Sequence, residues 1–331
     1  MLYEYADITD PHDLPAKLSE LKWHITGFID GDGSFPIILS PVQEKKFGWL
    51  IQPRFQIELR DTTDSLTLLK IIQRTIGTNA TILHGDQFLK LVVTNRRLLL
   101  EKVIPFFTTY KPALKQGDFA TMKFVCEALA AKQHMTTTGF KRIIKQISSQ
   151  PTDGETRRKW TYNDVIKDEE APATRTPSEP SFPDRADLRN YLAGFTDAEG
   201  ALGYAIAPTT KSITPYLTVT HQDTRVLKKL QEVIRCGNLS TGRLQIYGMQ
   251  NTSDKILPFL EKHKLIARRT TYQKFKNIFK LLQERKHKEH FNEIVTEIRS
   301  LNERGILRDH TLGTLKETQG EDMAQHQENV A

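Results

Sequence analysis

The chain carries one pattern twice, first as Trp23-His24-Ile25-Thr26-Gly27-Phe28-Ile29-Asp30-Gly31-Asp32-Gly33-Ser34-Phe35 and again as Tyr191-Leu192-Ala193-Gly194-Phe195-Thr196-Asp197-Ala198-Glu199-Gly200-Ala201-Leu202. Each copy places one acid, Asp32 or Glu199, directly before a glycine. In a single copy, an acid before glycine is most simply a solvated turn or helix cap. Two copies instead indicate two matched acidic sites, which suit a two-fold substrate such as double-stranded DNA.

Each of the two motifs is predicted to form the C-terminal part of an amphipathic helix. Apolar side chains recur at three- and four-residue spacing through residues 18–29 and 188–195. Because small side chains let two helix backbones approach, we expect the helices to pack closely, with Gly33 and Gly200 ending them in the usual C-terminal manner. Small residues occupy one face of each helix: Thr26, Gly27 and Gly31 in the first, and Ala193, Gly194 and Ala198 in the second.

The two acids are therefore expected to project from the C-terminal ends of neighbouring helices. That end of a helix carries partial negative charge, which disfavours a bare carboxylate and favours a cation. Two carboxylates side by side repel each other unless a divalent ion joins them, and oxygen-only ligation beside phosphate suits Mg²⁺. We take Asp32 and Glu199 as the candidate catalytic and metal-binding acids.

The order of predicted elements also repeats along the chain. After each motif come two strand patterns, a helix, a hairpin and a long amphipathic helix, so that the order is αββαββα twice. The matching segments are second strands at 55–62 and 217–224, helices at 66–76 and 226–234, hairpins at 81–94 and 239–247, and closing helices at 117–132 and 270–284.

These features resemble the paired motifs of the LAGLIDADG homing endonucleases. The second copy matches more closely, since Ile25 and Thr26 stand in place of Leu-Ala in the first. The resemblance covers about residues 15–307 and implies an α+β fold, in which two pseudo-symmetric αββαββα domains form a DNA-binding saddle. We expect the chain to divide into an N-terminal half at 1–134, an interdomain linker at 135–184, a C-terminal half at 185–307 and a disordered polar tail at 308–331. The latter part of the linker, which is rich in proline, is expected to be flexible to extended.

The second strands have one polar face, because polar and apolar side chains alternate along residues 51–59 and 217–222. An ordinary half-buried sheet shows the same alternation, but within this family such side chains are candidate major-groove contacts. The first strands are less polar and would make apolar or close backbone contacts. The candidate DNA-binding residues are Ser34, Ile38, Ser40, Gln52, Arg54, Gln56, Lys90, Thr218, Thr220, Gln222, Arg243, Gln245 and Tyr247.

In the family, a polar residue near the end of each second strand helps to hold solvent. The resemblance places this residue at Leu59 in the first half and at His221 in the second. His221 is either a solvent ligand or a partly buried polar residue that ends a strand. A leucine cannot position water, so the first site is either weaker or served by a neighbour: Glu58, Arg60 or Asp61.

The resemblance also implies a basic residue after each hairpin, which offsets phosphate charge. These positions fall at Lys115 in the first half and at Arg268 or Arg269 in the second. The metal site would further include Gly31 and Ala198, which directly precede the two acids. By contrast, Asp30 and Asp197 are expected to be structural residues that bond at the helix ends.

Composition narrows the class of protein. Lys and Arg outnumber Asp and Glu by 47 to 40, a net charge of +7 that supports a phosphate-bearing partner. Cys126 and Cys236 indicate buried thiols in a reducing compartment rather than a disulfide or a zinc site. No apolar run is long enough to cross a membrane, and residues 1–15 lack the features of a signal or transit peptide. We expect an intracellular protein of the cytoplasm, nucleoid or an organelle matrix, with no membrane partner.

The resemblance implies a site-specific double-strand DNA endonuclease that hydrolyses phosphodiesters with magnesium and promotes the mobility of an intron. Mn²⁺ is the alternative ion, and Ca²⁺ is the non-cleaving substitute. One chain with two unequal halves implies a monomer with internal pseudo-two-fold symmetry and a long, asymmetric DNA site. Two alternatives remain open, namely a maturase that binds intron RNA and a DNA-binding regulator that does not cleave.

Overall fold

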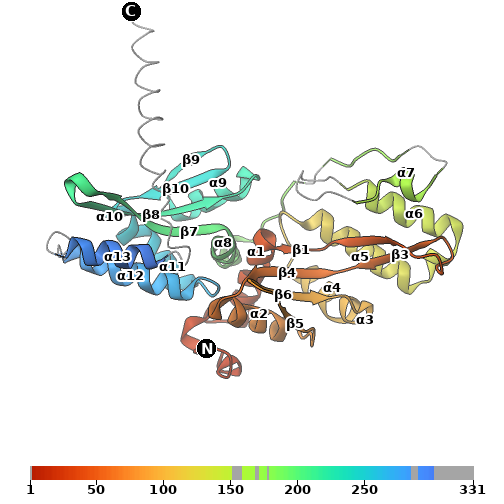
Figure 1. The fold of residues 1–331 in the computed structure, drawn as a ribbon, viewed down its shortest axis with the longest axis horizontal. Coiled ribbons are helices and arrows are strands. Elements are labelled where there is room, and N and C mark those ends of the chain that lie inside the picture. Colours follow the sequence, from red (N-terminus) through yellow and green to blue (C-terminus); the bar gives the residue numbers. More distant parts are fainter. Residues whose placement is uncertain (1, 151–158, 168–170, 177–178, 285–289, 302–331) are drawn as a thin grey trace, which may run out of the picture. The chain divides into compact units, whose positions relative to one another are not determined.

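The computed structural model describes residues 2–150, 159–167, 171–176, 179–284 and 290–301 (Figure 1). The chain forms two compact units, the first made of Met1–Ala201 with Leu217–Arg269 and the second of Leu202–Tyr216 with Thr270–Ala331. These units differ from the predicted halves, because both motif helices lie in the first unit. The domain boundaries predicted from the sequence repeat therefore stay a prediction.

The first repeat has the predicted order of elements and an α+β fold. An antiparallel sheet is backed by helices, and its strands run in the order β1-β4-β6-β5. The elements are α1 (Leu18–Asp32), β1 (Gly33–Ser34), β2 (Ile37–Pro41), β3 (Trp49–Pro53), β4 (Phe55–Arg60), α2 (Thr63–Ile76), β5 (Ile82–His84), β6 (Phe88–Val93), α3 (Arg96–Leu98), α4 (Ile104–Thr109) and α5 (Gln116–Ala130).

The two predicted first-repeat strands are each broken in two. The paired strands β2 and β3 form a separate two-stranded ribbon, whereas β1 and β4 belong to the four-stranded sheet. Prolines lie at both breaks, Pro36 after β1 and Pro53 at the end of β3, and proline has no N–H for the ladder. At the junction, the Arg54 N–H donates to the Pro36 carbonyl at 2.8 Å.

Part of the predicted linker is folded. Helix α6 (Thr137–Ser148) and the short helix α7 (Tyr162–Val165) enclose a second apolar core with α5 and the β2–β3 ribbon. Phe140, Ile143, Ile144 and Ile147 supply the buried face of α6, and Thr136 caps its first turn. The first part of the predicted linker is therefore helical, since four apolar side chains at helical spacing can be buried, and the flexible to extended conformation of its proline-rich latter part stays a prediction.

The second repeat has the same order of strands, β7-β8-β10-β9. It adds one helix, α13, that the repeat did not predict, and the predicted polar tail at 308–331 lies outside the described residues. The elements are α8 (Arg185–Glu199), β7 (Gly200–Ala207), β8 (Ser212–Thr220), α9 (Thr224–Ile234), β9 (Asn238–Ser240), β10 (Arg243–Tyr247), α10 (Met249–Asn251), α11 (Leu257–His263), α12 (Arg269–Gln283) and α13 (Phe291–Leu301).

Helices α1 and α8 pack against each other at the centre of the first unit (Figure 1). A methyl group on Gly27 would lie 1.8 Å from the Tyr191 carbonyl oxygen, and one on Gly194 would lie 1.8 Å from that of His24. The two backbones are therefore in direct contact, as the small-residue faces predict. This contact sets where both helices end. In the part of the chain that the structure describes, no helix combines the length and apolar character needed to cross a membrane.

Gly33 and Gly200 follow and end the two helices, but neither adopts the left-handed conformation that many helix-ending glycines have. Their φ angles are −87° and −81°, in the extended region, because each glycine enters a strand at once. Glycine is needed there for space. A methyl group on Gly33 would lie 2.7 Å from Ile29 Cγ2, and one on Gly200 would lie 2.3 Å from the Thr196 carbonyl oxygen.

Gly27→Ala or Gly194→Ala is expected to lower the free energy of unfolding by at least about 3 kcal/mol, because the new methyl group overlaps the facing helix backbone. Urea unfolding measures the effect. The matched control is Gly117→Ala in α5, whose methyl group would meet the flexible Gln150 side chain at 3.2 Å. That change is expected to be neutral or stabilising by up to about 1 kcal/mol. Equal stability of Gly27→Ala and the wild type would contradict direct contact of the helices.

Stability is also expected to fall between pH 6.5 and 4, because of His263 in α11. This side chain is 6% exposed, its Nδ1 lies 2.7 Å from Asn190 Oδ1 of α8, and burial lowers its pKa from 6.5 to about 4. As the pH falls, the unfolded chain takes up the proton first, so the free energy of unfolding decreases by at most about 3 kcal/mol. His263→Gln should remove this loss, as measured by urea unfolding at both pH values. An unchanged pH dependence would show that the histidine does not titrate in this way.

Candidate active site

The structure brings the two motif acids together. Asp32 is the last residue of α1 and Glu199 is the last residue of α8. A methyl group on Gly31 would lie 2.5 Å from Ala198 Cβ and 3.4 Å from Glu199 Oε1, so the Glu199 carboxylate lies beside the residue that precedes Asp32. Two carboxylates therefore share the negative ends of two contacting helices, as predicted.

The other acid of each motif is structural, which confirms the expectation for Asp30 and Asp197. Buried Asp30 accepts the backbone N–H groups of Ala113, Leu114 and Lys115. Buried Asp197 accepts those of Ile266, Ala267 and Arg268 in the same way. Each aspartate thereby anchors the loop that carries the basic residue of its own half.

These loops place a cation at the end of each motif helix. Lys115 Nζ donates to the carbonyls of Ile29, Gly31 and Gly33 at 3.1, 2.6 and 2.6 Å. The same pattern holds for α8, where Arg268 donates to the carbonyls of Asp197 and Ala198 at 2.8 and 2.6 Å. Both cations therefore bond backbone carbonyls at the negative C-terminal ends of the motif helices.

Arg268, rather than its neighbour Arg269, is the counterpart of Lys115. Arg269 instead pairs with Asp13 of the N-terminal segment at 2.6 Å and lies 3.8 Å from Asp64 of α2. The sequence left this choice open. Only the position of the loop relative to α8 distinguishes two adjacent arginines.

Two side-chain contacts between the helices, made by Tyr191 and His24, were not predicted from the sequence. Tyr191 of α8 donates its hydroxyl to Asp30 at 2.7 Å, and His24 Nε2 of α1 lies 3.2 Å from Asp197 Oδ2. Both side chains are fully buried and stand three residues before the contact glycine of their own helix. Each helix thus supports the loop of the opposite half. The shared position in the repeat was the available signal.

The electrostatics of the site combine burial with opposite charges. Burial raises the pKa of Asp32, while the positive charges of Arg268 and Lys115 lower it. One side of this carboxyl reaches solvent, which limits the effect of burial. Burial lowers the pKa of the Lys115 ammonium, and the nearby carboxylates oppose that effect. The two acids and two cations therefore form one interacting group.

The oxygen ligands present fit a magnesium ion. Among the described residues, no group of three or more His, Cys, Asp or Glu side chains converges, and the site contributes the two motif carboxylates, Asp32 and Glu199. Mg²⁺ characteristically binds one or two carboxylates together with water and phosphate oxygens. The predicted ligand roles of Gly31 and Ala198 remain predictions, and the carbonyl of each already accepts one bond from Lys115 or Arg268.

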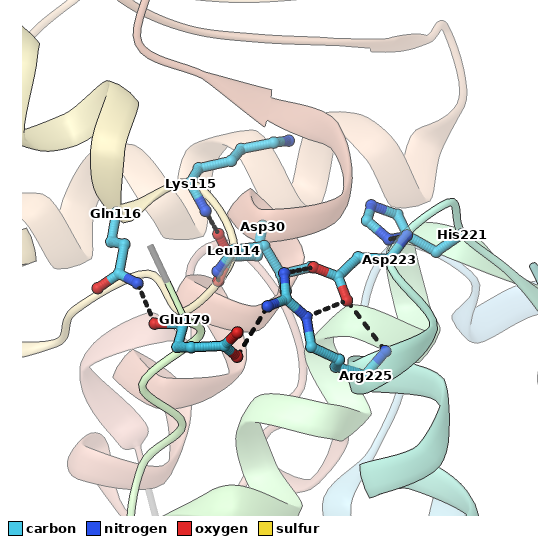
Figure 2. Close-up of polar contacts among 8 residues, drawn as sticks. All are labelled: Asp30, Leu114, Lys115, Gln116, Glu179, His221, Asp223 and Arg225. Atoms are coloured by element: carbon cyan, nitrogen blue, oxygen red, sulfur yellow. Dashed lines mark hydrogen bonds and ion pairs between the residues drawn. The ribbon is translucent and has the colours of Figure 1, made fainter. Parts of the chain in front are cut away.

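His221 lies next to Asp223 (Figure 2), and the charge of Lys115 acts on its ring. It follows β8, its ring contacts Phe195 of α8 at a centroid distance of 5.3 Å, and its Nδ1 accepts the Asp223 N–H at 3.0 Å. Burial lowers the pKa of His221, and the positive charge of Lys115 acts in the same direction. The neutral ring therefore carries its proton on Nε2. Leu59, the equivalent residue, packs against the first-repeat core.

The candidate DNA-binding residues lie on the polar faces of the sheets. Ile38 pairs with Gln52 on the β2–β3 ribbon, where Gln52 Oε1 accepts from Arg54, and Ser34 pairs with Gln56 between β1 and β4. Lys90 bonds Glu58 across the sheet at 2.8 Å. Ser40 lies on the same ribbon, and the rest lie on or directly after β8 and β10: Thr218, Thr220, Gln222, Arg243, Gln245 and Tyr247. Contact of any of them with DNA remains a prediction.

Known proteins are similar to this chain in both sequence and fold. A family model described as LAGLIDADG endonuclease matches residues 25–126. "Probable intron-encoded endonuclease 2" of Neurospora crassa is 26% identical over 284 residues, which cover 81% of this chain and 61% of that protein. "Probable intron-encoded DNA endonuclease 1" of Mycosarcoma maydis is 22% identical over 269 residues, or 76% of this chain and 96% of that protein. "Probable intron-encoded endonuclease 3" of the same organism is 27% identical over 270 residues, and this chain spans 61% and 47% of the length of the two Neurospora crassa proteins.

Solved structures show the same fold in single chains. The LAGLIDADG homing endonuclease I-LtrWI, bound to its target DNA, superposes with a TM-score of 0.73 at 22% identity, over 86% of this chain and 99% of that one. I-SmaMI, bound to an uncleaved DNA target in the presence of calcium ions, gives 0.72 at 21% identity, over 85% and 97%. The chain therefore matches the LAGLIDADG endonuclease family model over residues 25–126, and it shares the fold of LAGLIDADG homing endonucleases that have two domains in a single chain.

Proposed function

We propose that this protein is a site-specific endonuclease that cuts both strands of double-stranded DNA by metal-dependent phosphodiester hydrolysis and promotes the mobility of an intron. The observation that carries the proposal is the pair of acids at the ends of two contacting helices, each with its own basic residue. Relatives named as probable intron-encoded endonucleases support the same proposal.

Each residue of the site has a chemical task in this proposal. Asp32 and Glu199 would hold the divalent ion. Lys115 and Arg268 place positive charge where the scissile phosphates gain negative charge in the transition state. Mg²⁺, if bound by the two carboxylates, would lower the pKa of a bound water and offset the negative charge of the leaving oxygen. No covalent intermediate with the protein is required.

The substrate we propose is a long, asymmetric DNA site. The two repeats carry different residues at equivalent positions of their polar faces, so each would read a different half-site. Arginine, glutamine and lysine on those faces are side chains that bond base edges and phosphates. The proposed partner is therefore double-stranded DNA, and the host compartment is the one that holds the intron.

Asp32→Asn and Glu199→Gln are each expected to abolish double-strand cleavage and to retain DNA binding, because the neutral side chains hold a divalent ion poorly. The measurement is sequencing of ends after incubation with a pooled library of candidate intron-insertion DNA and Mg²⁺. Binding is measured with the same pool in Ca²⁺. The matched control is Glu232→Gln on the exposed surface of α9, which should cut as the wild type does. Full cleavage by either motif variant would exclude the proposed role of its acid.

Lys115→Met and Arg268→Met are each expected to slow cleavage about 10²- to 10³-fold, as loss of a single transition-state partner does. Single-turnover rates on the selected target measure the effect. Lys111→Met, in an exposed position of the same loop, is the control that should leave the rate unchanged. Since Lys115 also caps carbonyls of α1, urea unfolding of each variant separates a catalytic loss from loss of folded protein.

A further inference from the structure

The two halves of the site differ at one equivalent position, the residue near the end of the second strand. Leu59 holds this position in β4 and His221 holds it after β8. Leu59 is partly buried, pairs with Leu89 of β6 and packs against the first-repeat core. A hydrocarbon side chain in that environment has no group with which to hold water or phosphate.

Two of the three polar neighbours of Leu59 are bonded elsewhere, and the third, Arg60, is a cation that cannot bind a metal ion. Glu58 forms its ion pair with Lys90 at 2.8 Å, and Asp61 lies 3.7 Å from His84. Both interactions turn the carboxylates toward the sheet partners β6 and β5. Among the described residues, neither carboxylate next to Leu59 is therefore free to replace a solvent ligand in the first half.

His221 is fixed in the form that donates a hydrogen bond. Its backbone N–H donates to the Gly242 carbonyl at 3.0 Å, and its Nδ1 accepts from the Asp223 N–H at 3.0 Å. Because Nδ1 is occupied as an acceptor, the ring proton resides on Nε2. The ring edge rests against Phe195, one turn of α8 before Glu199.

A chain of bonds holds this arrangement and reaches the basic loop of the other half (Figure 2). Arg225 donates to both carboxylate oxygens of Asp223, at 2.9 and 2.6 Å, and to Glu179 at 2.9 Å. The Glu179 carbonyl in turn accepts from Gln116 at 2.6 Å, directly after Lys115. The first half contains no such chain for Leu59 among the described residues.

We propose that the protein cuts the two DNA strands in a fixed order, an inference that rests on the proposed nuclease function. The faster cut occurs at the site that contains His221. Arg225 is a positioning residue for that histidine, which it reaches through Asp223. The nicked duplex is then an intermediate of the reaction. The slow cut is the one whose site carries Leu59.

The order is tested on a supercoiled plasmid that carries the selected target, and on a duplex labelled differently on each strand. The wild type is expected to accumulate nicked plasmid and to cut one strand first. His221→Leu should slow that strand about tenfold, the rate equivalent of one hydrogen bond, and leave the other strand unchanged. Leu59→Gln should speed the slow strand and shorten the lifetime of the nick.

Arg225→Met tests the positioning role against Lys229→Met, a control on the same helix whose lysine pairs with Glu232 at 2.9 Å. Arg225→Met should reduce only the rate of the fast strand, and Lys229→Met should change neither rate. NMR of the imidazole nitrogens provides a readout apart from activity. The ring of His221 should be the Nε2–H tautomer in the wild type, and a mixture of tautomers in Arg225→Met.

Simultaneous cutting of both strands by the wild type would overturn the proposed order and leave the nuclease function intact. An equal loss on both strands in His221→Leu would overturn the assignment of His221 to one site. A protein that binds DNA but cuts neither strand would overturn the nuclease function and the order with it. Urea unfolding of Leu59→Gln and His221→Leu shows whether a changed rate reflects the site or the fold.

Discussion

The backbone contact between α1 and α8 positions everything else in the site. A methyl group on either contact glycine would lie within 2 Å of a carbonyl oxygen of the facing helix, which no packing adjustment accommodates. Because the helices meet this closely, their C-terminal ends emerge side by side. Each helix ends on its acid, so the two carboxylates, one from each repeat, become a single site without any loop that joins them.

That arrangement creates an electrostatic problem, since two helix ends and two carboxylates concentrate negative charge. The protein offsets part of it with Lys115 and Arg268, which also bond the terminal carbonyls. Asp30 and Asp197 position these cations through backbone N–H groups. The braces from Tyr191 and His24 link each loop to the opposite helix. The remaining negative charge is what a divalent cation would balance.

Much of the fold could be predicted from sequence, because the helix and strand periods of the two repeats are strong and agree. The failures have local causes. Helix α6 was missed because proline-rich composition further along the linker outweighed Phe140, Ile143, Ile144 and Ile147 at helical spacing. The breaks at Pro36 and Pro53 depend on which N–H groups the ladder needs, and that requires the register. Gly33 and Gly200 could be placed from the motif, but the crowding that requires glycine there is visible only in the structure.

The sequence by itself determined the two acids, the order of elements and the small-residue faces, because each of these is a local pattern that occurs twice. Tertiary structure decided what depends on approach between distant segments. It selected Arg268 over Arg269, revealed the braces of Tyr191 and His24, and joined His221 to the loop of Lys115 through Arg225 and Glu179. Hydrogen bonds between residues dozens of positions apart leave no periodic trace in a single chain, so only the folded backbone shows which side chains meet.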